Sequence, residues 1–113
     1  MYSKELVKGT LKTIILNLLE EQGKMYGYEI TQKVRAISDG KLVLTEGALY
    51  PSLHALEADG LLTTETVNIG KRIRKYYTVT AKGGSLAQEK MNEFADFVNM
   101  MKLVLSPKFS TQI

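Results

Sequence analysis

Hydroxyl, carboxylate and imidazole side chains gather between residues 45 and 54 of this 113-residue sequence. Thr45 can begin a helix, because its hydroxyl can accept a hydrogen bond from a free N–H group of the first turn. Glu46 follows, where the helix dipole favours an acid. Small residues at Gly47 and Ala48 let this end approach a partner closely, and its free N–H groups suit a phosphate. The stretch predicts an anion-binding helix end.

The rest of this helix has a buried side and an end signal. Leu49, Leu53 and Leu56 recur at spacings of four and three, which predicts one apolar stripe, and Gly60 is a typical stop. Pro51 removes one hydrogen bond at a cost of about 3 kcal/mol, so we expect a bend or an irregular first turn. On this stretch alone, a kinked surface helix is as good an interpretation as a binding helix.

Catalytic and metal-binding chemistry has little support. The sequence has no cysteine and one histidine, which excludes a disulfide, a thiolate metal site and a histidine cluster. No glycine-rich phosphate loop is present, and Glu20 and Glu21 are adjacent, so they cannot face each other on a helix. We therefore expect a protein that is not an enzyme and that needs no cofactor and no metal.

The positive charge is confined to one region. Residues 1–60 have a net charge of −1, residues 61–84 of +4 and residues 85–113 of 0. The cations of the middle region include Lys71, Arg72, Arg74 and Lys75. A local positive field attracts polyanions, although a solvated basic hairpin would look the same.

Length and hydropathy favour one small domain with an appended element. The chain is 44% hydrophobic, which is enough for a modest core. Lys4 and Lys8 interrupt any signal-peptide pattern, and no run approaches the roughly 18 apolar residues of a membrane span. We expect a cytoplasmic protein with no membrane partner.

Periodicity predicts two helices before residue 45. Residues 3–22 have a broad apolar face, although Gly9 weakens the first turns and the firm helix should begin nearer Thr10. Residues 25–40 form the second helix, and residues 41–44 form a brief strand or an extended link. The buried stripe of the second helix should consist of Tyr26, Ile30, Val34 and Ile37.

Two strands should follow Gly60. Residues 61–69 and 72–80 are rich in β-branched and aromatic residues, and a turn-like segment joins them into a hairpin with a basic tip. Three helices followed by such a hairpin indicate a mostly α, winged helix-turn-helix fold, in which the third helix enters the major groove of DNA. In this order, the helix end and the basic tip together favour DNA binding.

The last element is a long helix over residues 80–105, which completes a division into a DNA-binding domain (1–79), a dimerisation helix (80–106) and a loose tail (107–113). A heptad seam runs along it. We expect the seam to pack on a second copy in a two-fold dimer, with a fold-back onto its own domain as the alternative. The seam residues are Ala87, Met91, Phe94, Val98, Met101 and Leu105.

With these elements assigned, the chain resembles the PadR-type transcriptional regulators over nearly its whole length, and its single last helix is similar to that of the short subfamily. The resemblance implies a homodimeric winged-helix repressor that responds to aromatic or drug-like compounds. Three features depart from the family. Ala48 and Ala55 stand where it usually has Thr and a basic residue, and the strand pair lacks the Trp that the family often has, with Thr66 nearby. The matching segments are YGYEI (26–30), EGALYPSLH (46–54), LEADGL (56–61), RIRKYY (72–77) and residues 80–83.

Within that interpretation, each candidate side chain has a role. Thr45, Gly47 and Ser52 should anchor the third helix on phosphates, beside Ala48. Glu46 and His54 could read base edges, although Glu46 could simply stabilise the dipole and His54 could be structural. Tyr50 could contact a thymine methyl group or a sugar, or pack in the core. The four cations Lys71, Arg72, Arg74 and Lys75 should bind phosphates along the wing.

Two further expectations concern the dimer. The two third helices should lie roughly 34–36 Å apart, which implies a pseudo-palindromic operator in double-stranded DNA. Soft apolar side chains on the last helix could bind a flat hydrophobic effector, or could form only the dimer core. These side chains are Met91, Phe94, Phe97 and Met101. A winged-helix adaptor that binds proteins and never DNA is the alternative function.

Overall fold

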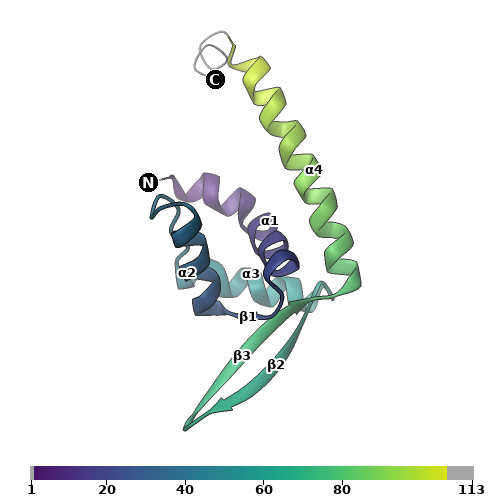
Figure 1. Cartoon of the computed structure of the whole chain (residues 1–113). Coiled ribbons are helices and arrows are strands. Elements are labelled where there is room, and N and C mark those ends of the chain that lie inside the picture. Colours follow the sequence, from purple (N-terminus) through teal and green to yellow (C-terminus); the bar gives the residue numbers. More distant parts are fainter. Residues whose placement is uncertain (1, 107–113) are drawn as a thin grey trace.

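The computed structural model describes residues 2–106, which form four helices and one antiparallel sheet (Figure 1). The helices are α1 (Lys4–Gln22), α2 (Gly27–Ile37), α3 (Glu46–Ala58) and α4 (Ala81–Val104). The strands are β1 (Met25–Tyr26), β2 (Leu62–Ile69) and β3 (Arg72–Val79). The order confirms the predicted winged helix-turn-helix with a long C-terminal helix. The predicted tail, with the stop at Pro107, lies outside the described residues.

Helix α1 begins earlier than predicted. The Ser3 hydroxyl accepts a hydrogen bond from a first-turn amide at 3.3 Å, and the helix runs without a break through Gly9. The predicted start nearer Thr10 is wrong, because the cap offsets the weak helix propensity of the glycine. The end matches the predicted bound at residue 22: Gly23 follows with a φ of 81°, and its N–H donates to the carbonyl of Leu19 at 2.9 Å.

The sheet has a third strand that the sequence did not reveal. Met25 pairs with Tyr77 and Tyr26 with Tyr76, so the strand order is β1-β3-β2. The prediction of a two-stranded hairpin was therefore incomplete. Two residues are too short to show the alternation that identifies a strand.

Helix α2 is shorter than the predicted 25–40 at both ends, because it begins at Gly27 and ends at Ile37. Tyr26, predicted in its buried stripe, is instead a half-buried residue of β1. Ile30 and Val34 are buried as expected, but Ile37 is 68% exposed, because it is the last residue of the helix and the chain turns away there. Residues 41–44 form the extended link rather than a strand, and only Leu44 among them is buried.

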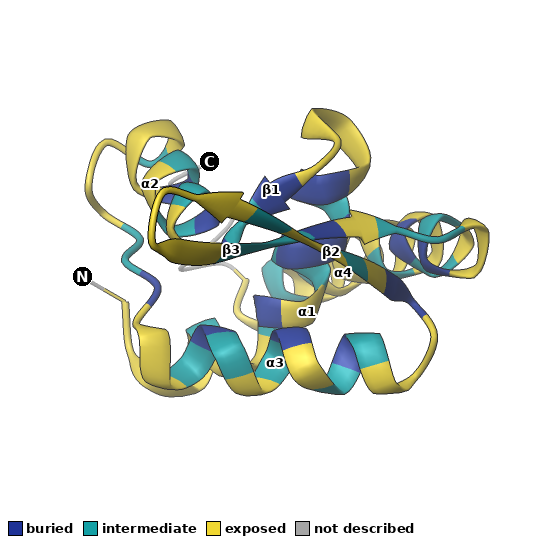
Figure 2. Cartoon of the chain, turned by 90° about the horizontal axis from the view of Figure 1, so that it is seen from below, coloured by how far each residue is buried: buried dark blue, intermediate teal, exposed yellow. Residues whose placement is uncertain are grey.

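The core lies between α1, α3 and the sheet. Figure 2 shows α3 with its buried residues toward the body of the domain and its exposed residues on the opposite side. The hairpin of β2 and β3, hereafter the wing, and the second half of α4 both project from this core (Figure 1). The most deeply buried side chains are Ile15, Leu16, Leu19, Ile30, Leu49, Leu53, Leu56 and Tyr77.

The C-terminal helix is docked at its beginning. The Thr80 hydroxyl accepts a hydrogen bond from the N–H of Gly83 at 3.0 Å and donates to the carbonyl of Gly60 at 2.8 Å. Lys82 donates to the carbonyl of Asp59 at 3.1 Å. The first residues of α4 are therefore fixed to the turn that ends α3. Throughout residues 2–106, none of the helices has the length and hydropathy of a membrane span.

Candidate functional site

The N-terminal end of α3 is capped and open to solvent. The Thr45 hydroxyl accepts a hydrogen bond from the N–H of Ala48 at 3.3 Å, as predicted. Glu46 and Gly47 are exposed, and a Cβ atom added to Gly47 would have no neighbour within 4 Å. Residues 46–58 are helical throughout, so the irregular first turn expected from Pro51 is absent. The result is a regular helix end that another molecule can approach closely.

Tyr50 and His54 follow along the same helix. The ring of Tyr50 is half-buried against Gly27, where an added Cβ atom would lie 2.7 Å from the Tyr50 Cζ. Tyr50 thus packs against the core, and its ring centroid lies 6.4 Å from that of His54. His54 is exposed, whereas Ser52 is half-buried. The absence of a side chain at position 27 therefore leaves room for the phenol end of Tyr50.

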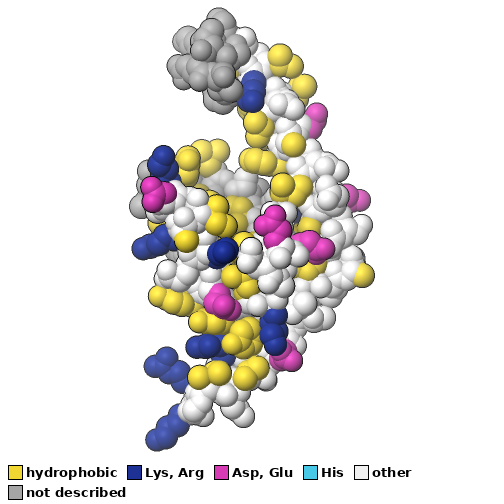
Figure 3. All heavy atoms as spheres, viewed as in Figure 1, with side chains coloured by type: hydrophobic (Ala, Val, Ile, Leu, Met, Phe, Trp, Pro, Cys, Tyr) yellow, Lys and Arg dark blue, Asp and Glu magenta, His cyan; other side chains and the backbone are white. Residues whose placement is uncertain are grey.

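The tip of the wing carries free cations. Gly70 makes the turn with a φ of 61°, and Lys71 and Arg72 beside it are exposed. Figure 3 shows Lys and Arg side chains gathered at the lower end of the molecule, where the wing projects. Ile73 is 72% exposed, because this part of the strand lies beyond the core, although its alternation places it on the face of Tyr77.

Arg74 is held on the outer face of the sheet. Its guanidinium carbon lies 4.0 Å from the ring centroid of Tyr26, and it donates a hydrogen bond to the Tyr76 hydroxyl at 3.5 Å, a long distance for such a bond. This hydrogen bond raises the pKa of Arg74 above its ordinary value. The two tyrosine rings pack edge to face, with centroids 5.5 Å apart. Arg74 is therefore a cation with a preset position.

Lys75 points toward α3 and differs from the other wing cations. Its ammonium group lies 3.2 Å from a carboxylate oxygen of Glu57, in the last turn of α3. Thr64 of β2 donates to the other oxygen of the same carboxylate at 3.0 Å. The bond from Thr64, followed by that from Lys75, lowers the pKa of Glu57. Sequence reasoning missed Glu57 and Thr64. An acid in a helix's last turn, where the dipole disfavours it, was the available signal.

A groove lies between these surfaces, and residues from each of them line it. It has a volume of about 720 Å³ and separates the start of α2 and the outer side of α3 from the wing. Seen from below, α3 and the wing lie on the same side of the molecule (Figure 2). Five predicted DNA-binding residues line it: Tyr50, His54, Arg72, Arg74 and Lys75. The other six do not line it: Thr45, Glu46, Gly47, Ala48, Ser52 and Lys71. The lining includes Tyr26, Gly27, Tyr28, Tyr50, His54, Arg72 and Arg74.

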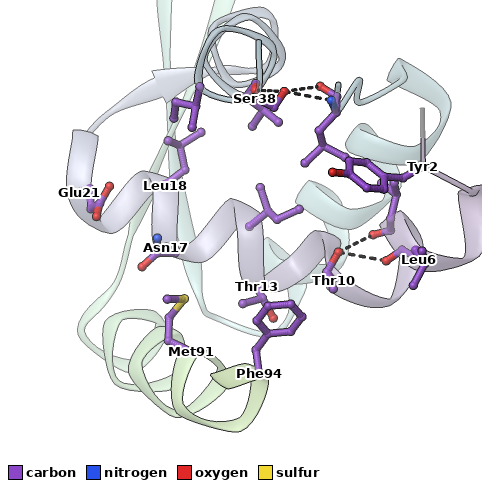
Figure 4. Close-up of a pocket in the computed structure, with 15 residues that line it drawn as sticks. Tyr2, Leu6, Thr10, Thr13, Asn17, Leu18, Glu21, Ser38, Met91 and Phe94 are labelled. Atoms are coloured by element: carbon purple, nitrogen blue, oxygen red, sulfur yellow. Dashed lines mark hydrogen bonds between the residues drawn. The ribbon is translucent and has the colours of Figure 1, made fainter. Parts of the chain in front are cut away.

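A second hollow lies between α1, α2 and α4. It has a volume of about 600 Å³, and Met91 and Phe94 point into it from α4 toward α1 (Figure 4). Phe97 and Met101, the other predicted effector contacts, do not line it. Most of its remaining lining is apolar and includes Leu6, Val7, Ile14, Leu18, Val34 and Leu42.

The predicted seam of α4 divides into two parts. Ala87 is 3% exposed and belongs to the core of its own chain, so its prediction as a contact with a second copy is wrong. Beyond it, Met91, Phe94 and Leu105 are exposed, and Val98 and Met101 are half-buried. Exposure rises along α4 after Ala87, because only the first half of this helix packs beside α1 (Figure 1).

Comparison with known proteins assigns this architecture. Residues 15–89 match the transcriptional regulator PadR-like family. The solved transcriptional regulator Cth-833 of Clostridium thermocellum is 29% identical with a TM-score of 0.84, covering 94% of this chain and 100% of that chain. A solved PadR family transcriptional regulator of Eggerthella lenta is also 29% identical, with a TM-score of 0.78, covering 91% of this chain and 88% of that chain. Transcriptional regulator Rv3488 of Mycobacterium tuberculosis is 44% identical over 46 residues, 41% of this chain and 43% of that protein. The chain belongs to the PadR-like family of transcriptional regulators.

Proposed function

We propose that the protein is a sequence-specific DNA-binding repressor of transcription that acts as a homodimer. The observation that carries this proposal is the groove that Tyr50 and His54 of α3 share with Arg72 and Arg74 of the wing. In winged helix-turn-helix proteins the third helix enters the major groove and the wing follows the backbone. Membership of a family of transcriptional regulators supports the same use.

The helix supplies both positioning and sequence reading. Thr45 and Gly47 lie at the exposed start of α3, where backbone N–H groups can hold a phosphate, and a Cβ atom on Gly47 would meet no neighbour within 4 Å. Ser52 follows in the second turn, half-buried, and its hydroxyl is proposed to add a phosphate contact. Glu46 and His54 are exposed and are proposed to contact base edges. Ala48 sits in the first turn of the helix beside them.

The wing supplies nonspecific affinity. Lys71 and Arg72 are exposed at its tip and are proposed to bind phosphates on the flanking backbone. Arg74 can add a third contact, because its stacking on Tyr26 holds the guanidinium group beside the groove. Tyr50 lines the same groove between helix and wing and can contact a sugar or a thymine methyl group.

The dimer is proposed from the unpaired apolar surface of α4. Phe97, Leu103 and Val104 are 54%, 68% and 69% exposed, which is unusual for an isolated soluble chain. The apolar hollow beside Met91 and Phe94 continues this surface onto α1. A second copy of α4, packed on this helix and hollow, would cover both and place two α3 helices on successive turns of DNA, roughly 34 Å apart.

The same hollow is the proposed effector site. About 600 Å³ with a largely apolar lining suits a flat aromatic or drug-like compound. Met91 and Phe94 would contact it from α4, and Phe97 and Met101 would act through the partner helix. Titration of a panel of aromatic compounds should raise the melting temperature of the protein. No shift with any member of the panel would leave only dimerisation for these residues.

Salt-dependent binding to duplex DNA tests the function. Fluorescence anisotropy with a labelled duplex, between about 50 and 200 mM salt, should show affinity that falls steeply as salt rises, because bound phosphates release counterions. A protein–protein adaptor would bind no duplex even at low salt. That result would refute the DNA-binding proposal.

A further inference from the structure

Glu57 of α3 accepts hydrogen bonds from the wing. It lies in the last turn of α3, where the helix dipole disfavours an acid, and no basic residue occupies that turn. The compensation comes from the wing instead. Thr64 of β2 donates to one carboxylate oxygen at 3.0 Å, and Lys75 of β3 to the other at 3.2 Å. One carboxylate therefore binds both strands of the wing.

The contact lies where the wing leaves the body of the domain. Leu62 and Tyr77, at the base of the hairpin, are buried in the core. Tyr77 pairs with Thr64, and the next pair toward the tip on the same face joins Lys75 to Thr66. Beyond these residues, the described contacts of the hairpin are the pairing of its two strands and the contacts of Arg74 with Tyr26 and Tyr76 at its outer face. A bond at this level sets the direction of the projecting part.

We infer that Glu57 is a positioning residue, which fixes the angle between the wing and α3 through Lys75 and Thr64. Lys75 serves this bond and does not bind DNA phosphate, in contrast to the prediction from sequence. This inference rests on the proposed function, since the fixed angle presents helix and wing to one DNA duplex. A preset angle spares the complex the cost of ordering the wing on binding.

A second ion pair of the wing provides a matched control. Glu65 of β2 lies 2.8 Å from the ammonium group of Lys24, which precedes β1 and does not belong to α3. Both side chains are at least half exposed, at 58% and 50%, compared with 34% and 40% for Glu57 and Lys75. Substitution of Glu65 thus makes the same chemical change without cutting the link to α3.

The first arm of the test measures geometry without DNA. Because the chain has no cysteine, Lys71→Cys and Ala58→Cys place one spin label on the wing tip and one at the end of α3. Electron-electron double resonance, with labelled chain diluted in unlabelled protein, should give a narrow distance distribution. Glu57→Met should broaden it, and Glu65→Met should not. A distribution that stays equally narrow in Glu57→Met overturns the inference.

The second arm measures binding in unlabelled protein with the native Lys71. Glu57→Met and Glu65→Met each remove one negative charge, which by itself favours DNA. Glu57→Met should nevertheless weaken binding about ten-fold, whereas Glu65→Met should leave it equal or stronger. Lys75→Met should weaken binding to the same extent, with no further loss when combined with Glu57→Met and with an unchanged salt slope.

The two proposals fail in different ways. If Lys75→Met lowers the salt slope of the proposed dimer by about two, one contact for each chain, and weakens binding equally with and without Glu57, then Lys75 binds a phosphate and the inference is wrong. If wild-type protein binds no DNA, the proposed function is wrong. In that case the distance distributions still show whether Glu57 holds the wing.

Discussion

At the scale of single residues, one glycine leaves the space that the ring of Tyr50 occupies. Gly27 begins α2 beneath the ring of Tyr50, and no side chain larger than hydrogen fits between them. Tyr50 in turn lines the groove between α3 and the wing. The position of this proposed DNA contact therefore depends on the absence of a methyl group on a different helix.

Gly27→Ala should displace the Tyr50 ring. Overpacking of this kind typically costs about 1–3 kcal/mol of stability, and the moved ring should also weaken DNA binding. Gly9→Ala is the control, because its Cβ would meet no atom within 4 Å and a mid-helix glycine is unfavourable by about 1 kcal/mol. Urea denaturation should show a loss of stability for Gly27→Ala and a gain for Gly9→Ala. Equal stability of the two variants would contradict this packing.

The sequence revealed the chemistry of individual residues better than their partners. Thr45 as a cap and Gly60 as a stop follow from local rules, and both are confirmed. The partner of Lys75 could not be derived, because Glu57 lies 18 residues away and meets it only through the packing of α3 on the wing. Local periodicity carries no information about such long-range contacts.

At the scale of elements, the proposed function assigns phosphate contacts to the wing tip, and these contacts supply nonspecific affinity for DNA. The double variant Lys71→Gln/Arg72→Gln removes two contacts from each chain of the proposed dimer, and should reduce the slope of log affinity against log salt by roughly 3.6 per dimer, since each phosphate contact contributes about 0.9. Anisotropy titrations at several salt concentrations measure this slope. Lys4→Gln/Lys8→Gln, with the same charge change on exposed positions of α1, should leave it close to wild type. An equal reduction in both would indicate only a net-charge effect.

The start of α4 is a rigid joint between two elements. A Cβ atom on Gly83 would collide with the backbone carbonyl of Leu61, which cannot rotate away as a side chain can. Gly83→Ala should therefore destabilise the fold by about 1–3 kcal/mol. Gly84→Ala is the neighbouring control, because it meets only the flexible carboxylate of Glu20, at 3.0 Å. A denaturation midpoint for Gly83→Ala that matches the control would show that this joint is loose.

Elements were the best-predicted level of the structure. Helices with long apolar stripes and the β-branched hairpin were recognised, because their periods extend over many residues. Strand β1 was not predicted, because two residues are too few to show an alternating pattern. Ile37 was assigned to a buried stripe, but α2 ends there and its side chain is exposed. Heptad spacing alone could not divide α4 between its own core, which takes Ala87, and a second copy.

At the scale of the whole molecule, the projecting half of α4 keeps large apolar side chains exposed to solvent in the single chain. Phe94→Glu puts a charge into the proposed interface, where an unpaired buried charge is strongly unfavourable. Sedimentation velocity should show a dimer for wild type and a monomer for this variant. Asn99→Glu, an exposed position outside the heptad seam, should remain dimeric. A monomeric wild-type protein, or a Phe94→Glu variant that stays dimeric, would remove this half of the proposal.

Selection of bound fragments from random duplex DNA, with the purified full chain, tests the central claim most directly. The account predicts enrichment of a pseudo-palindrome with half-sites about one helical turn apart, because a two-fold dimer presents two α3 helices at that spacing. Fragments without a shared sequence, or with a single unpaired half-site, would contradict a symmetric reader of DNA. Failure to retain any duplex at low salt would contradict DNA binding itself.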